Sequence, residues 1–146
     1  MSLSRFQKIT LGIAGVTAAS VGSFILAAPQ AFYASYGIAP GADPSLLSEL
    51  RAPGAGLAAL GAIMLAGVVR AAWSPVALVA ALTVYLAFPA GRLFSLTVDG
   101  LPSASVLGAL GVEVTIAALC LMAFGRPRAN KPATPQFGVP QNHYPT

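Results

Sequence analysis

The feature that most constrains the fold is a set of long apolar segments, each long enough to cross a lipid bilayer. The first runs from Ile9 to Ala28, twenty residues without a charged side chain. At about 1.5 Å per residue, a helix of this length crosses a hydrocarbon core of roughly 30 Å. In the whole chain 56% of the residues are hydrophobic and 8% are charged, far more apolar than one water-soluble core requires. The sequence therefore predicts an integral membrane protein.

The apolar segments predict an all-α fold, a four-helix bundle in the membrane formed by residues 1–125. The predicted spans are about 9–28, 53–69, 75–98 and 103–124. Asp43 and Ser74 are each followed by proline, a pattern typical of a helix N-cap and first turn. Residues 45–50 are expected to form a short helix near the membrane surface, which Pro53 would kink or interrupt.

The charged residues outside the predicted spans are distributed asymmetrically. Asp43 and Asp99 fall on one side of the membrane, and the basic residues Arg5, Lys8, Arg70, Arg126, Arg128 and Lys131 fall on the other. By the positive-inside rule, both termini are expected in the cytoplasm. A cleaved signal peptide is the alternative for the first segment, because basic residues precede it and small residues end it.

The composition changes at Arg126, where prolines become frequent. Such a segment cannot build a core, so residues 126–146 are expected to form an extended, proline-rich cytoplasmic tail. Two interpretations remain open, a solvated tail or a peptide that binds along a cytoplasmic partner. The candidate partner-binding residues are Arg126, Arg128, Phe137 and Tyr144.

Ionisable residues within or next to the predicted spans form the main candidate site. They are Glu49, Arg51, Arg92, Asp99 and Glu113. A charge at the centre of a span costs roughly 2.5 to 3.5 kcal/mol on insertion scales, so such residues are seldom accidental. Arg92 is expected about 9 Å below the outer end of its helix, and Glu113 about 15 Å below. An arginine stem can extend over this difference in depth, which predicts an Arg92–Glu113 ion pair.

The third span has one polar face, which carries Tyr85, Phe88, Arg92, Ser95 and Asp99 at helical spacing. It should point inward or toward a water-filled cavity, because lipid would leave its donors unpaired.

The other pairings stay open. Arg51 has Asp99 or Glu113 as candidate partners, and Glu49 has Arg92. The cluster is interpreted either as a structural latch that sets helix register or as a site for a lipid headgroup, a carboxylate or a proton.

Small residues at regular spacing predict close helix contacts. The second span carries Gly54, Ala58, Ala62 and Ala66 at every fourth position, and the third carries Gly91 between Ala87 and Ser95. Small residues let helix backbones approach closely in lipid. They serve either packing within the bundle or docking against another membrane protein.

Several kinds of site are excluded by the residues available. Cys120 is the only cysteine and His143 the only histidine, so no intrachain disulfide or cluster of soft metal ligands can form. The sequence also lacks a nucleophile with a neighbouring base and a glycine-rich phosphate loop. We therefore predict no catalytic residues, no metal, no cofactor and no enzymatic activity. The basic residues are spread over segment ends and do not form one stripe, so no nucleic-acid partner is predicted.

Four short segments and Glu113 carry a resemblance to a known family. The segments are ELRAPGAG at 49–56, VYLAF at 84–88, GRLFS at 91–95 and DGLPS at 99–103. The chain resembles a bacterial domain-of-unknown-function family of small four-helix integral membrane proteins related to the DoxX-like group, over about residues 9–124. It also looks like an accessory subunit of an actinobacterial mammalian-cell-entry (MCE) lipid transport complex. The resemblance implies a multi-pass protein of the bacterial inner membrane with no established activity.

These observations lead to two expected functions. The first is a non-catalytic accessory or stabilising subunit of a larger membrane assembly, in particular a lipid transport complex with permease subunits as partners. The alternative is a stand-alone membrane protein that binds or transports a lipid or small molecule at the Arg92/Glu113 cluster. Membrane lipids are expected partners in both.

Overall fold

The structure, a computed structural model, describes residues 3–125, and all regular elements in this range are helices, with no strand among these residues. The elements are α1 (Arg5–Ala27), α2 (Pro29–Ala34), α3 (Pro44–Val69), the 3₁₀ turn η1 (Ala71–Trp73), α4 (Ser74–Val98) and α5 (Ala104–Phe124). Helices α1, α3, α5 and α4 together with η1 are long and apolar enough to cross a membrane. The predicted all-α fold with four spanning helices is confirmed.

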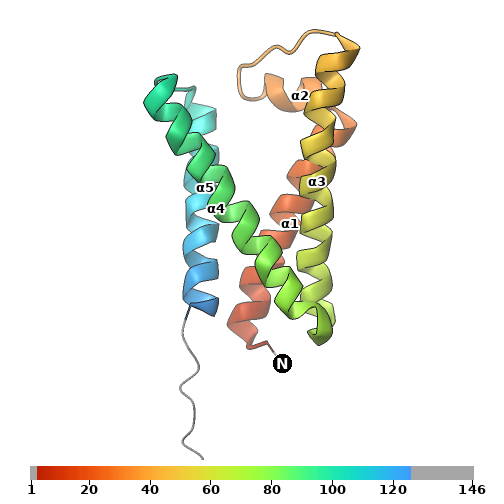
Figure 1. Ribbon diagram of the computed structural model, residues 1–146, viewed down its shortest axis with the longest axis vertical. Coiled ribbons are helices and arrows are strands. Elements are labelled where there is room, and N and C mark those ends of the chain that lie inside the picture. Colours follow the sequence, from red (N-terminus) through yellow and green to blue (C-terminus); the bar gives the residue numbers. More distant parts are fainter. Residues whose placement is uncertain (1–2, 126–146) are drawn as a thin grey trace, which may run out of the picture.

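The helices form two arms that meet at one end and separate toward the other (Figure 1). One arm contains α1 and α3, and the other contains α4 and α5. At the closed end, where α1 begins and α5 finishes, Gln7 Nε2 donates to the carbonyl of Ala123 at 2.9 Å. The short helix α2 lies at the opposite, open end. The helix backbones are therefore arranged in a V, with the two arms farther apart at the open end (Figure 1).

Helices α1 and α3 make the most extensive contact in the molecule, and their backbones touch. Gly22 of α1 and Gly61 of α3 are both buried in this contact. A Cβ atom at Gly22 would collide with the backbone of Ala58, and one at Gly61 would collide with the backbone of Ala19. This close approach stabilises the association of two apolar helices in lipid, because small residues let many atoms come into van der Waals contact.

The predicted stripe on α3 coincides only partly with this contact. Gly54 is buried and Ala58 and Ala66 are half-buried, whereas Ala62 is exposed. The residues that α3 buries are Gly54, Leu57, Gly61, Met64 and Gly67. Four residues advance the helix by about 400°, so a stripe with that step drifts off the contact face. The seven-residue step from Gly54 to Gly61 is close to two full turns and stays on it.

The buried core lies where the arms come together. Its fully buried residues are Leu11, Ala14, Met64, Ala77, Ala81 and Cys120. Most of them are small, so the helices pack closely here. The free thiol of Cys120 belongs to this core.

The helix ends follow local capping chemistry, with one departure from the predicted pattern. Ser4 and Gln7 form a capping box, which starts α1 at Arg5, before the predicted start at Ile9. Asp43 caps α3 as predicted, since its Oδ1 accepts from the Leu46 amide at 2.9 Å. Ser74 does not cap α4. Its hydroxyl instead donates to the carbonyl of Gly67 at 3.3 Å, and this bond joins α3 to α4.

The predicted break at Pro53 is wrong, because α3 runs from Pro44 to Val69 without interruption. The expected short surface helix over residues 45–50 is therefore the first part of α3. Pro53 removes the donor for the carbonyl of Glu49. Both residues are exposed, so water or lipid headgroups near the helix start can satisfy that carbonyl.

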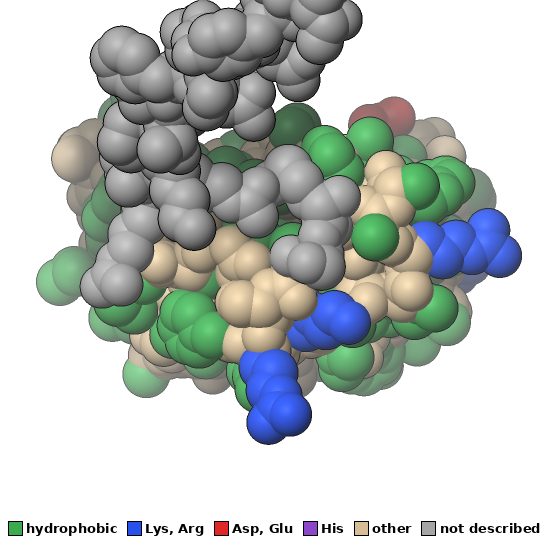
Figure 2. Space-filling view, turned by 90° about the horizontal axis from the view of Figure 1, so that it is seen from below, with side chains coloured by type: hydrophobic (Ala, Val, Ile, Leu, Met, Phe, Trp, Pro, Cys, Tyr) green, Lys and Arg blue, Asp and Glu red, His purple; other side chains and the backbone are tan. Residues whose placement is uncertain are grey.

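Charged side chains separate between the two ends of the molecule. Basic side chains gather on the closed end (Figure 2), where Arg5 and Lys8 lie in the first turns of α1 and Arg70 follows α3. Asp43 precedes α3 and Asp99 follows α4 at the open end. The candidate tail residues Arg126, Arg128, Phe137 and Tyr144 lie outside the residues that the structure describes.

Candidate functional site

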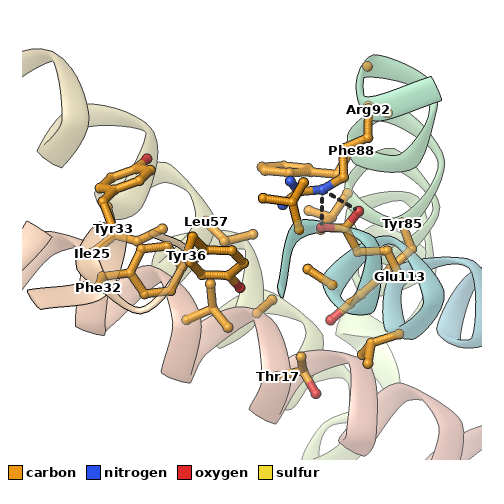
Figure 3. Close-up of a pocket in the computed structure, with 18 of the residues that line it drawn as sticks. Thr17, Ile25, Phe32, Tyr33, Tyr36, Leu57, Tyr85, Phe88, Arg92 and Glu113 are labelled. Atoms are coloured by element: carbon orange, nitrogen blue, oxygen red, sulfur yellow. Dashed lines mark hydrogen bonds and ion pairs between the residues drawn. The ribbon is translucent and has the colours of Figure 1, made fainter. Parts of the chain in front are cut away.

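A cleft of about 690 Å³ lies between the two arms, on the side of the open end. Its walls come from α1, the α2 region, α4 and α5, with Leu57 contributed by α3 (Figure 3). Most of the lining side chains are apolar, and they include Val21, Ile25, Phe32, Ile38, Leu57, Val84, Ala87, Phe88, Val106, Ala109 and Val112. The volume is within the range of small-molecule sites, roughly 300 to 1,000 Å³.

The predicted Arg92–Glu113 ion pair is present and lies in the wall of this cleft. Arg92 Nε donates to both carboxylate oxygens of Glu113, at 3.1 Å to Oε1 and 3.0 Å to Oε2. The Arg92 side chain is 31% exposed and that of Glu113 is 16% exposed. The pair thus joins α4 to α5, and the arginine is the more accessible partner.

Most of the polar face predicted on α4 lines the cleft, with Asp99 as the exception. Tyr85, Phe88 and Ser95 line it together with Arg92. Ser95 Oγ donates to Asp99 Oδ2 at 2.8 Å, which satisfies the upper end of this face within α4. The helical spacing in the sequence therefore located the α4 wall of the cleft.

Tyr85, which lines the cleft, makes a hydrogen bond between the arms. The hydroxyl of Tyr85, a residue only 3% exposed, donates to the carbonyl of Ala14 at 2.7 Å. Ala14 lies near the middle of α1. The cleft therefore extends from the open end toward the centre of the spans.

Aromatic residues form the wall opposite the ion pair. Phe32 lies edge-on to Tyr33 and is tilted against Tyr36, with ring centroids 5.3 and 5.1 Å apart. Pro29 at the first position of α2 starts the short helix that carries two of these rings. Ser103 Oγ donates to the Tyr36 carbonyl at 3.0 Å and so joins this segment to the start of α5. The aromatic wall is thereby attached to both arms.

The other predicted charged residues lie away from the ion pair. Glu49 and Arg51 are exposed on α3, and Arg92–Glu113 is the single ion pair within residues 3–125. Arg51 lines a separate depression with Leu26 and Pro44. Helices α4 and α5 diverge from α3 toward the open end, where α3 begins (Figure 1). The candidate pairings of Glu49 and Arg51 with the cleft residues and with Asp99 are therefore not found.

Gly91 has a different position from the predicted helix contact. It is exposed, lines the cleft, and a Cβ atom there would have no neighbouring atom within 4 Å. Its small size widens the cleft on the α4 side, since a larger side chain would occupy that space.

The cleft wall combines a large apolar surface with a few polar side chains. Among the described residues, Arg92 and Glu113 are the charged ones in this wall. Among residues 3–125, no three histidine, cysteine or carboxylate side chains lie close enough to hold a metal ion. The thiol of Cys120 is buried in the core and does not line the cleft.

Several wall residues were not recognised from the sequence. Thr17, Val21 and Ile25 on α1 have no distinguishing local pattern, because any apolar membrane helix has similar residues. Tyr33 and Tyr36 were assigned only to the membrane interface. Pro29, which precedes them, could have indicated a short helix. The packing of that helix against the arms depends on tertiary contacts.

Comparison with known proteins identifies a family for this chain. No curated protein and no solved structure is significantly similar to the chain. A family model described as "Domain of unknown function (DUF4345)" matches residues 6–124. The match includes all four spanning helices and the whole cleft. The chain therefore belongs to the DUF4345 family.

Proposed function

We propose that the protein binds an amphiphilic membrane molecule, such as a lipid, in the cleft between its arms. The observation that carries this proposal is a cleft of about 690 Å³ with largely apolar walls and one ion pair, inside helices long enough to span a membrane. An apolar pocket with a few convergent polar groups is the usual form of a small-molecule site. In this role the protein is a non-catalytic binding protein.

The two walls of the cleft suit the two parts of an amphiphile. The apolar residues of α1 and α4, among them Val21 and Val84, can surround an acyl or isoprenoid chain. Arg92 supplies hydrogen-bond donors for a polar head. Phe88, which lines the cleft, is 41% exposed, so the site is accessible from outside the bundle.

The distribution of charge supports an orientation in the membrane. The basic closed end would face the cytoplasm, with both termini on that side, and Asp43 and Asp99 would face outward. The cleft then lies in the outer half of the bilayer. The resemblance noted in the sequence supports placement in the bacterial inner membrane.

A pair of glycine substitutions tests cleft binding. Gly91 lines the cleft and Gly108 on α5 does not, while a Cβ atom at either position has no neighbour within 4 Å. We expect Gly91→Leu to fill the cleft and Gly108→Leu to leave it open, with little effect of either on folding. Native mass spectrometry of purified protein should show a bound amphiphile on the wild type and on Gly108→Leu, and little on Gly91→Leu. Equal occupancy of all three would contradict the proposal.

We further infer a second role, as an accessory subunit of a larger membrane assembly that moves lipid. The supporting observation is the open surface of α5, the least buried spanning helix, on which Gly108 and Gly111 have no neighbour within 4 Å of an added Cβ. The resemblance to the DoxX-like group and to MCE accessory subunits favours such a partner, with permease subunits as the contacting chains. Small residues on an open helix face permit another helix to approach closely.

Purification through a tag on the chromosomal copy, in mild detergent, tests the second role. Stoichiometric recovery of a large transporter would support it, and a lone small particle that carries lipid would support cleft binding alone. Gly108→Leu should reduce recovery of the partner, whereas Gly91→Leu should not. Unchanged recovery with Gly108→Leu would exclude the α5 face as the docking surface.

A further inference from the structure

Arg92 makes its ion pair with only one of its three nitrogens. Both hydrogen bonds to Glu113 come from Nε. An arginine has four further N–H donors on Nη1 and Nη2, and within residues 3–125 no protein acceptor is bound to them. Figure 3 shows the guanidinium extending from α4 into the cleft, on the side opposite the aromatic wall. The cleft therefore offers a group of donors that need acceptor oxygens from a bound molecule.

The charge of the site limits which acceptors fit. Arg92 and Glu113 carry opposite charges, and no other charged residue within the described range lines the cleft, so the formal charges of these lining residues sum to zero. An anionic headgroup at the Nη donors would lie close to the Glu113 carboxylate. Its attraction to Arg92 would then be offset by repulsion from Glu113, so an anion gains little net electrostatic energy in this neutral site. Carbonyl and hydroxyl oxygens accept the same hydrogen bonds without this repulsion.

We propose that the amphiphile bound in the cleft has an uncharged head with carbonyl or hydroxyl oxygens, of the acylglycerol type, and that Glu113 is the residue that rejects anionic lipids. The inference rests on the proposed cleft function and names its ligand class. Arg92 would bind the head through its Nη donors. Glu113 orients Arg92 through Nε and keeps the site neutral, and the apolar wall around Val21 and Val84 surrounds the chain.

Two probes that differ by one phosphate group test the ligand class. Monopalmitoylglycerol and palmitoyl-lysophosphatidate share one acyl chain and one glycerol, and the second adds a phosphate. Analogues of both with a photoreactive group at the same chain position are incorporated in equal amounts into nanodiscs that contain the full chain. Labelled peptides from the cleft wall are quantified after irradiation. The compared proteins are wild type, Glu113→Gln and the double variant Arg92→Gln/Glu113→Gln.

We expect the wild type to be labelled at least about tenfold more by the uncharged probe than by the phosphate probe. Glu113→Gln leaves Arg92 as a net positive charge, so the phosphate probe should become the preferred one. The double variant has no charge in the described part of the cleft wall and lacks the donors of Arg92. It should therefore prefer neither the uncharged probe nor the phosphate probe. The change in ratio between variants is independent of how each probe partitions into the bilayer.

The possible outcomes separate the inference from the proposed function. Equal or stronger labelling of the wild type by the phosphate probe would overturn the ligand class and leave cleft binding intact. If Glu113→Gln does not change the ratio of labelling by the uncharged and phosphate probes, the role of Glu113 in rejecting anions would be overturned. If neither probe labels the cleft wall of the wild type, the proposed function fails, and the ligand class with it. Should Glu113→Gln not accumulate, the wild-type ratio compared with that of the double variant decides the ligand class.

Discussion

Gly22 on α1 lies directly against the backbone of Ala58 on α3, with no room for a side chain between them. This contact and the matching one at Gly61 hold the first arm of the molecule together. The second arm has no such contact toward the open end, where Gly91, Gly108 and Gly111 have no neighbouring atoms within 4 Å of an added Cβ. The tight arm and the open arm together produce the cleft.

Gly22→Ala should destabilise the protein by about 1 to 3 kcal/mol, because the added methyl group would push α3 away. Gly12→Ala on the same helix is the control, since a Cβ there meets nothing within 4 Å. That change should be neutral or stabilising by about 0.5 to 1 kcal/mol, because alanine favours a helix more than glycine does. Thermal unfolding in detergent compares the two. Equal effects would contradict the backbone contact.

Glu113→Gln should lower stability by about 1 to 3 kcal/mol, because it leaves the Arg92 charge without a counter-charge. The expected loss is smaller than for a fully buried pair, since the Arg92 side chain is 31% exposed. Arg92→Gln/Glu113→Gln should recover most of the loss because no charge remains unpaired. Accumulation in membranes and thermal unfolding measure both variants. Normal accumulation and stability of Glu113→Gln would refute the stabilising role of the pair.

Tyr85→Phe should cost about 1 kcal/mol, because it removes the buried hydrogen bond from the Tyr85 hydroxyl to the Ala14 carbonyl. Tyr33→Phe is the matched control, since the Tyr33 hydroxyl makes no hydrogen bond to any of residues 3–125. Unfolding midpoints in detergent distinguish the two variants. A loss of similar size in Tyr33→Phe would show that the hydroxyl of Tyr85 has no special role.

Asp43→Ala should lower stability by about 1 kcal/mol, because the Leu46 amide loses its acceptor at the start of α3. Asp43→Asn keeps an acceptor oxygen and should behave like the wild type. Hydrogen exchange over the first turn of α3 provides the local measurement. Unchanged protection in Asp43→Ala would indicate that Pro44 alone is sufficient to start the helix.

The sequence was most informative where the physical constraint is local. The Arg92–Glu113 pair followed from two charges at compatible depths on two spans, because an unpaired charge in a membrane is costly. The α4 wall of the cleft followed from helical spacing. Glu49 and Arg51 were placed with the same cluster incorrectly, because depth along a helix does not specify the distance between arms.

The number of spanning helices and the presence of an intramembrane ion pair were determined by the sequence alone. Lipid offers no partner for backbone or charged groups, so apolar segments of this length form helices and opposite charges pair. Only the tertiary structure decided that the arms separate, that α2 joins the wall, and that Gly91 borders a cleft. These features depend on which helix faces fit together. The helices pack closely at Gly22 and Gly61 but not at Gly91, and this difference arises only when the helices assemble.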